Sequence, residues 1–181
     1  MCIRDRSSPG WYPDSTTNLV NSYVGLSYNE SIQINVPITT QLNIFGQPVT
    51  VDIDSMVVDN ILGFPSGFTY SCDLVNCQVL GGTSLCITIY SITDPTSIDV
   101  GIYPLDIQYT DYANNVPFIG TFSQNIINSD YVIEIVNNNS GCTDSTATNY
   151  DPSANNDDGS CFYCDISVSY THLTLPTKRI V

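Results

Sequence analysis

Carboxylate and amide side chains are concentrated between residues 144 and 158, near the end of the sequence. Six of them carry the oxygen ligands that calcium prefers: Asp144, Asn149, Asp151, Asn155, Asp157 and Asp158. Gly159 follows directly and allows a sharp turn. The spacing is not that of an EF-hand, and no glutamate follows that could bind a cation through both oxygens. Two interpretations remain open: a calcium site, or a solvated acidic loop in which Asp and Asn form turns.

Catalytic side chains are scarce. Residues 7–167 contain no Lys, Arg or His, which excludes Ser-His-Asp sites, Cys-His sites and Schiff-base lysines from this stretch. A pair of carboxylates, as in glycosidases, remains conceivable, and the sequence offers Asp52 with Asp54, or Asp106 with Asp111. On a strand, Asp52 and Asp54 would share one polar face, which is typical of a solvated surface. We expect no enzymatic activity and no required cofactor.

The chain is strongly acidic, with a formal net charge of −14 at pH 7 over 181 residues. All of its 18 acidic residues except Asp5 lie between residues 7 and 167. Nucleic acids and anionic membranes attract basic side chains, so we expect neither as a partner. No apolar run approaches the roughly 20 residues of a membrane-spanning helix, so we expect no membrane insertion.

The basic residues are confined to the two ends of the sequence. They are Arg4, Arg6, His172, Lys178 and Arg179. Residues 1–6 and 168–177 resemble translated adapter sequence from the preparation of sequencing libraries. We therefore expect residues 1–6 and most of residues 166–181 to be artefacts, and the remainder to be an internal piece of a longer protein. Residues 7–15 would be a linker.

Apolar and polar residues alternate repeatedly between residues 16 and 136, which is the pattern of half-buried strands. The alternating apolar positions are Ile32, Ile34 and Val36; Leu42 and Ile44; Val49, Val51 and Ile53; Tyr103, Leu105, Ile107 and Tyr109; and Tyr131, Ile133 and Ile135. Turn residues separate these runs, among them Gly81-Gly82, Asp94-Pro95 and Asn114-Asn115. Seven or more short strands with this spacing predict an all-β fold, an antiparallel β-sandwich over residues 16–136. Pro104 predicts that its strand lies at a sheet edge or contains a bulge at this position.

The alternation ends after Val136, and residues 137–165 are rich in Asn, Asp, Ser, Thr and Gly. A module of this size is too small to bury a core of its own. It must therefore depend on cysteines or on a metal ion for stability.

Two parts of the chain resemble known families. The first part resembles the cadherin-like Ig domains of bacterial surface proteins. Four segments carry this resemblance, in the same order: GLSY (25–28), GFPSGFTY (63–70), DPT (94–96) and GIYPLDI (101–107). They depart from that pattern at Ser27, Phe64 and Asp94. The segment GCTDSTATNYDPSANNDDGSC (141–161) resembles a cysteine-bracketed repeat of large secreted bacterial proteins. The resemblance implies an Ig-like sandwich followed by one acidic repeat, in an extracellular or cell-surface protein.

An extracellular location, implied by that resemblance, favours disulfides among the cysteines. Cys142 and Cys161 bracket the repeat and form the first expected pair. Cys72, Cys77 and Cys86 give one pair and one remaining cysteine. We expect Cys72 to pair with Cys77 or with Cys86.

These observations favour a non-catalytic structural or adhesion module, which serves spacing, display or surface adhesion. Its partners would be neighbouring domains of the same chain, or glycans and proteins at the surface. The alternative is a carbohydrate-binding module attached to a secreted degradative enzyme, because 12 Tyr, 6 Phe and Trp11 could stack on sugars. That alternative requires an exposed, coplanar row of aromatic side chains on one sheet face.

Overall fold

The computed structural model describes residues 8–14, 16–117 and 120–163. The chain divides into two compact units, Met1–Asn137 and Asn138–Val181, called unit 1 and unit 2 below. The division follows directly after the last alternating strand. Among the described residues, no helix is long and apolar enough to cross a membrane.

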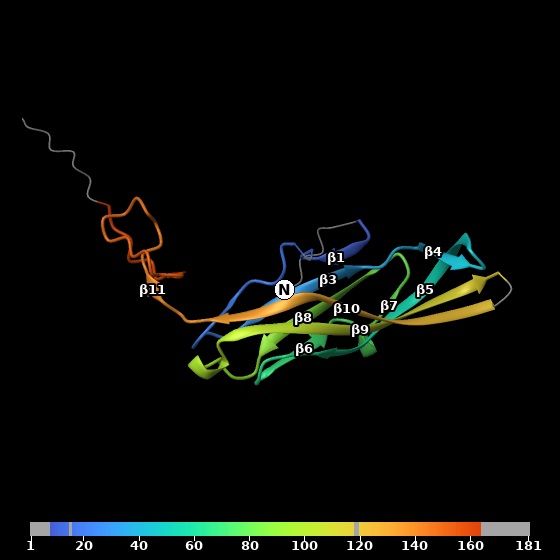
Figure 1. The fold of residues 1–181 in the computed structure, drawn as a ribbon, viewed down its shortest axis with the longest axis horizontal. Helices are drawn as coiled ribbons and strands as arrows, with labels where there is room; N and C mark the ends of the chain where they lie inside the picture. The colour runs from blue at the N-terminus through green and yellow to red at the C-terminus, as the bar shows by residue number, and fades with distance from the viewer. Residues whose placement is uncertain (1–7, 15, 118–119, 164–181) are drawn as a thin grey trace, which may run out of the picture. The chain divides into compact units, whose positions relative to one another are not determined.

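Unit 1 consists of two β-sheets (Figure 1). The first sheet is antiparallel, in the order β1 (Gly10–Tyr12), β3 (Asn29–Asn35), β8 (Ser84–Ser91) and β6 (Phe68–Cys72). The second has the order β2 (Ser22–Tyr23), β10 (Gly120–Val136), β9 (Gly101–Val116), β5 (Gln47–Leu62) and β4 (Thr39–Ile44), and β7 (Gln78–Leu80) also pairs with β5. Two short 3-10 helices, η1 (Val75–Cys77) and η2 (Ser97–Asp99), lie in the connections.

The core of unit 1 is built from both sheets. The first sheet contributes, among others, Ile32, Ile34, Leu85, Ile87 and Ile89; the second contributes Met56, Val58, Leu105, Ile107, Tyr131, Ile133 and Ile135. Burying an aliphatic side chain of this size contributes about 1.5–3 kcal/mol, so this cluster holds the two sheets together. The predicted all-β, sandwich-like fold is confirmed, and the alternating residues of β3, β9 and β10 face this core.

The strands of the second sheet are longer than the sequence suggested. β5, β9 and β10 contain 16, 16 and 17 residues, and Asn114-Asn115, expected to form a turn, belongs to β9. β9 pairs with β10 on one side and β5 on the other, with register shifts instead of breaks. Asn114 lies opposite Asp52 of β5, and the β9–β10 register shifts between Ala113↔Phe122 and Val116↔Gly120, so the two asparagines form a bulge in the strand and not a turn. Val51, Ala113 and Val116 form a second small core in this extension.

Residues 10–12 form a strand, which corrects the interpretation of residues 7–15 as a linker. Strand β1 pairs with β3 from Gly10↔Asn35 to Tyr12↔Gln33. Trp11 packs against the main core. The strand has only three residues and no alternation long enough to be recognised, so the local pattern does not reveal it.

The pairing of β2 is a second departure from the expected topology. β2 runs parallel to β10, with Ser22 opposite Ile135 and Tyr23 opposite Val136. The backbone N–H of Val24 continues this ladder and donates to the Val136 carbonyl at 3.0 Å. The second sheet is therefore mixed, with one parallel edge strand.

Pro104 lies where β9 has a neighbour on one side only. The β5–β9 pairing ends at Leu62↔Asp106, whereas Pro104 is still paired with Val132 of β10. Beyond the end of β5, Gly63 has φ +94°, and a Cβ atom there would lie 2.0 Å from the Pro104 carbonyl oxygen. The close approach requires glycine, and the predicted local edge at Pro104 is confirmed.

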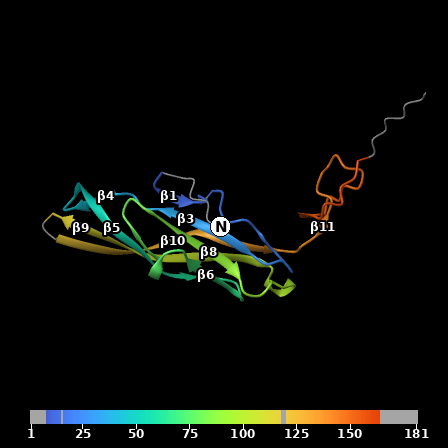
Figure 2. The same ribbon diagram turned by 180° about the vertical axis from the view of Figure 1, so that it is seen from behind.

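Unit 2 has little regular structure (Figures 1 and 2). Its strands β11 (Ser140–Gly141) and β12 (Asn156–Asp157) form one short parallel pair. The buried side chains include Cys142 and Ala147, at 1% and 8% exposure. With so little apolar burial, cross-links and hydrogen bonds must hold this unit together.

Candidate functional site

The Cys142–Cys161 disulfide closes unit 2. The two Cα atoms are 4.8 Å apart, and the cysteines are 19 positions apart in sequence. All six residues considered as calcium ligands lie between them. The disulfide therefore fixes the two ends of the acidic segment.

Each of the four aspartates in that segment accepts a hydrogen bond from the backbone N–H two residues further on. Asp144 Oδ1 accepts from the N–H of Thr146 at 2.8 Å, and Asp151 Oδ1 accepts from the N–H of Ser153 at 2.9 Å. The same pattern joins Asp157 to Gly159 at 3.2 Å and Asp158 to Ser160 at 2.9 Å. This repeated geometry is the Asx turn.

The two asparagines cross-link separate parts of unit 2. Asn149 donates to the Ser160 carbonyl at 2.8 Å, and its Oδ1 accepts from the N–H of Phe162 at 2.9 Å. Asn155 Oδ1 accepts from the N–H of Asn139 at 2.9 Å. Both amides therefore satisfy backbone groups that no sheet or helix pairs.

Hydrogen bonding lowers the pKa of three aspartates in this loop, Asp144, Asp151 and Asp158. The pKa of Asp144 is lowered, chiefly by the Tyr163 hydroxyl and next by the Thr146 backbone N–H. The side-chain and backbone donors of Ser153 and Ser160 lower the pKa of Asp151 and of Asp158 in the same way. A hydrogen bond to a carboxylate favours its charged form. The turn interpretation accounts for the contacts to Thr146, Ser153 and Ser160, whereas the Tyr163 hydroxyl bonds to Asp144 from outside its turn.

The described residues contain no group of three or more His, Cys, Asp or Glu side chains placed to share a metal ion. The six candidate ligands therefore lie within one loop without converging as carboxylates on a point. A calcium ion there would need amide and backbone oxygens for most of its six to eight ligands. Calcium binding stays a prediction from composition.

In unit 1, Cys72 is bonded to Cys77, with Cα atoms 5.3 Å apart. Cys72 pairs across the sheet with Ile87 of β8. Cys86 directly precedes Ile87, so its side chain leaves the opposite face of the strand. This alternation excludes the Cys72–Cys86 alternative, and Cys86 takes part in a disulfide of its own. Cys164 lies outside the described residues.

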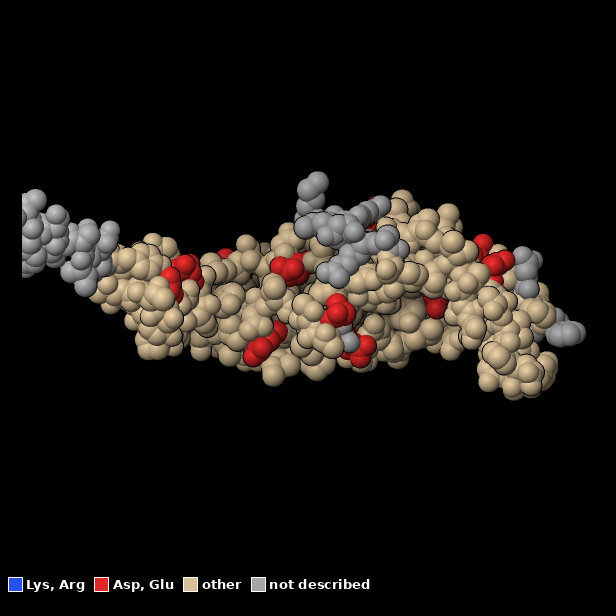
Figure 3. All heavy atoms as spheres, turned by 90° about the horizontal axis from the view of Figure 1, so that it is seen from above, with Lys and Arg blue, Asp and Glu red and all other residues tan. Residues whose placement is uncertain are grey.

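The carboxylate pairs considered for catalysis lie on a solvent face or on opposite faces of a strand. Asp52 and Asp54 are exposed on the solvent face of β5. Asp106 is exposed, whereas Asp111 is half-buried and alternates with the inward residues Tyr109 and Ala113. Residues 106 and 111 therefore point to opposite faces of β9. The space-filling view shows acidic side chains scattered over the visible face, with no basic side chain among the described residues (Figure 3).

The aromatic residues of unit 1 mostly pack inward. Trp11 lies 5.3 Å from Tyr109 and 6.2 Å from Tyr131 between ring centroids, and the ring planes are tilted. Of the aromatic side chains described in unit 1, Phe45 and Tyr112 are the exposed ones, Phe45 in the β4–β5 turn and Tyr112 within β9. These two residues do not make the coplanar row that a polysaccharide-binding face requires.

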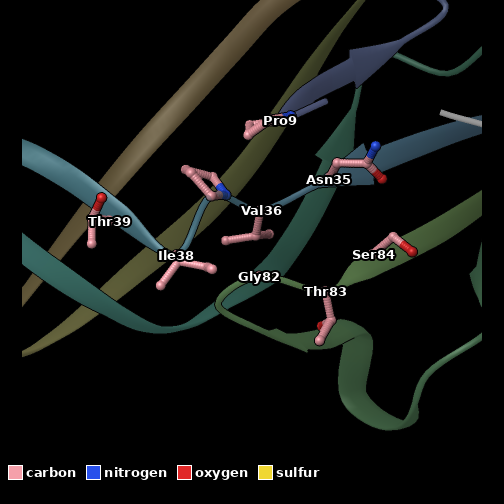
Figure 4. A pocket seen from close by; sticks show the side chains of 9 residues that line it. Pro9, Asn35, Val36, Ile38, Thr39, Gly82, Thr83 and Ser84 are labelled. Atoms are coloured by element: carbon pink, nitrogen blue, oxygen red, sulfur yellow. The ribbon is translucent and has the colours of Figure 1, made fainter. Parts of the chain in front are cut away.

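Sequence reasoning missed a pocket at the margin of the unit 1 core. A cavity of about 150 Å³ is lined by Trp11 of β1 and by Tyr109 and Asp111 of β9, together with Met56 of β5. Beside it, a wider pocket of about 620 Å³ lies between the start of β1, the β3–β4 connection and the loop before β8 (Figure 4). Asp111 occupies an inward position of the β9 alternation, and this was the signal that could have revealed the site.

Comparison of the chain with protein-family models, with curated protein sequences and with solved structures finds no match to any of the three.

Proposed function

We propose that this chain is a non-catalytic structural module of a large secreted or cell-surface protein. Unit 1 acts as an Ig-like spacer, and unit 2 is a repeat closed by its own disulfide. The module serves spacing, display or adhesion, and its direct partners are neighbouring domains of the same chain. The Cys72–Cys77 and Cys142–Cys161 disulfides support an extracellular location, because disulfides persist in oxidising compartments.

The strand order of unit 1 carries the Ig-like part of this proposal. If β1, β3, β5, β6, β8, β9 and β10 are lettered A to G, the two sheets contain A-B-E-D and G-F-C. That is the distribution of strands in an Ig constant-type sandwich. The resemblance of residues 25–107 to Ig-like surface domains supports the same assignment.

The pairing of β2 with β10 suits a module that is pulled from its two ends, because this ladder carries the load once the three-residue strand β1 has separated from β3. Because the strands are parallel, force on the N-terminal side of β2 and on the C-terminal side of β10 loads their hydrogen bonds in shear. All bonds of the ladder must then yield together. The Val24 N–H to Val136 carbonyl bond at 3.0 Å belongs to this loaded set.

Single-molecule force spectroscopy on the full chain, held between marker domains, tests the proposal. We expect a distinct unfolding event for unit 1, at a lower force in Val24→Pro than in Val24→Ala. Both variants lose the valine side chain, but only proline removes the N–H donor. Equal unfolding forces in the two variants, or no resolvable event in the wild type, would contradict a load-resisting role.

The carbohydrate-binding alternative is tested by retention of the full chain on insoluble polysaccharides. We expect no retention above that of an unrelated acidic protein, because the exposed aromatic residues described in unit 1, Phe45 in a turn and Tyr112 within β9, make no row on one sheet face. Retention that is lost in Tyr112→Ala would favour the alternative over the spacer.

A further inference from the structure

The cavity between Trp11, Tyr109 and Asp111 combines aromatic rings with an unpaired carboxylate. Trp11 and Tyr109 come from opposite sheets, with ring centroids 5.3 Å apart and planes tilted by 54°. Both side chains line the cavity of about 150 Å³, as does Met56. This space lies at the edge of the main core, where the two sheets meet.

Asp111 is unusual for a residue on the inward face of a strand. It is half-buried, and no described residue donates a hydrogen bond to its carboxylate or forms an ion pair with it. Burial alone raises its pKa above the usual range. Removing a carboxylate from water without a partner costs free energy, so such a residue is a candidate for ligand binding.

The charge of the surroundings determines what could complement Asp111. Residues 7–167 carry no Lys, Arg or His, so this stretch supplies no side-chain counter-ion. A negative potential concentrates cations. A single carboxylate beside apolar side chains is a poor site for a metal ion, which needs several oxygen ligands. An organic cation can instead place its alkyl groups against Trp11 and Tyr109, whose ring faces attract positive charge.

The adjoining pocket offers room for the rest of such a molecule. It is about 620 Å³ in volume and shares Asn35, Val36 and Pro37 with the smaller cavity. Figure 4 shows Ile38 and Thr39 on one side and Thr83 and Ser84 on the other. Apolar carbons and hydroxyl groups together suit a short chain with a polar end.

We propose that unit 1 binds a small organic cation, with its alkylammonium group in the cavity lined by Trp11, Tyr109 and Asp111 and its remainder in the adjoining pocket. The proposal is independent of the spacer role. The alkylammonium group could be quaternary, as in choline, or primary, as in butylammonium, and the two probes distinguish these sources.

The test follows the fluorescence of Trp11, the only tryptophan of the chain. The full chain is titrated with choline and with butylammonium at constant ionic strength, maintained with NaCl. The neutral control is 3,3-dimethylbutan-1-ol, which has the shape of choline without the charge. We expect a saturable change for at least one cation and none for the neutral alcohol. No saturable change with either cation overturns the proposal, as does an equal response to the alcohol.

Two variants locate the site. Asp111→Asn removes the charge and keeps the shape, and we expect it to weaken cation binding about tenfold or more, equivalent to about 1.4 kcal/mol. Asp52→Asn is the matched control, since it removes the same charge from the exposed face of β5, and it should bind as the wild type does. Equal affinities in wild type and Asp111→Asn, or equal losses in both variants, would place the cation elsewhere.

A measurement on the wild type keeps the test valid if Asp111→Asn folds poorly. Nuclear Overhauser contacts should join the methyl protons of bound choline, or the butyl protons, to the Trp11 indole. Their absence at saturating ligand contradicts the site. Saturable binding of methyl glucoside in place of both cations would also overturn the proposal and support the carbohydrate alternative.

Discussion

The hydroxyl of Tyr131 donates a hydrogen bond to the backbone carbonyl of Pro13 at 2.6 Å, across 118 positions of sequence. Tyr131 is 1% exposed and belongs to the main core. Its ring also lies 6.2 Å from that of Trp11, between centroids. The segment around β1 is thus tied to β10 both by packing and by a polar contact.

Tyr131→Phe should therefore destabilise unit 1. The substitution keeps the ring and leaves the Pro13 carbonyl without this donor, at a cost of about 1 kcal/mol. Urea unfolding followed by Trp11 fluorescence measures the change in the midpoint. Tyr112→Phe is the control, because Tyr112 is exposed, and it should shift stability by less than about 0.5 kcal/mol. Equal shifts would mean that the hydroxyl of Tyr131 contributes nothing.

The Cys142–Cys161 disulfide should be essential for unit 2 and dispensable for unit 1. In the chain-entropy model a loop of this length contributes about 3 kcal/mol, and unit 2 has little apolar core to compensate for its loss. Replacing both cysteines by serine should collapse the dispersion of the amide NMR signals of residues 138–163 alone. Replacing Cys72 and Cys77, only five positions apart, should cost less. Persisting unit 2 signals in the first variant would contradict this account.

The calcium hypothesis predicts that calcium stabilises unit 2. A ligand that binds the folded state raises the unfolding midpoint, so a midpoint measured at about 1 mM calcium should exceed that in chelator, as extracellular sites bind in this range. The replacements Asp157→Asn and Asp158→Asn together should abolish the increase, whereas Asp52→Asn should leave it intact. An unchanged midpoint in the wild type would leave the turn interpretation as sufficient.

Added salt should stabilise the whole chain. Residues 7–167 contain acidic side chains and no basic ones, so their repulsion is uncompensated. The Debye length falls from about 30 Å to about 8 Å as salt rises from about 10 mM to about 150 mM. The unfolding midpoint should therefore rise as the salt concentration rises. A variant with Asp52→Asn and Asp54→Asn should respond less steeply. A flat response of the wild type would show that the repulsion is negligible.

Asp14 should titrate well below an ordinary aspartate. The Thr16 hydroxyl, and next the Thr17 backbone N–H, lower the pKa of Asp14 to about 2. Because the folded-state pKa is depressed, the stability that ionised Asp14 contributes is present above pH ~4 and is lost as the pH falls toward 2. Carboxyl-carbon NMR measures the titration. In Thr16→Val the pKa should rise, and an unchanged pKa would mean that the hydroxyl has no effect.

Ionisation of Asp111 should affect the stability of unit 1 in the opposite direction to ionisation of Asp14. Burial raises its pKa, so its ionisation costs stability, and this cost disappears as the pH falls through the raised value. Asp111→Asn should therefore stabilise unit 1 at neutral pH by more than Asp52→Asn, which relieves the general repulsion alone. Equal midpoints for the two variants would show that burial of the Asp111 carboxylate carries no penalty.

The sequence alone determined the β class and the faces of most strands. Ile32, Ile34, Leu105 and Ile107 face the core as their alternation predicts, because the period of two is a property of the strand itself. The confinement of the basic residues to the two ends of the sequence is likewise evident from the sequence alone. Asp and Asn in unit 2 form the turns that their short side chains favour locally.

Only the tertiary structure decided which residues meet across the sheets. The choice of Cys77 over Cys86 as the partner of Cys72 depends on the β6–β8 register, which no local pattern contains. Asn114 remains in a strand because β5 supplies its cross-strand partner, Asp52. Asp111 faces inward by the same alternation as Leu105. Its half-burial in a pocket depends on Trp11, from a three-residue strand about 100 positions earlier, because burial is a property of the assembled layers.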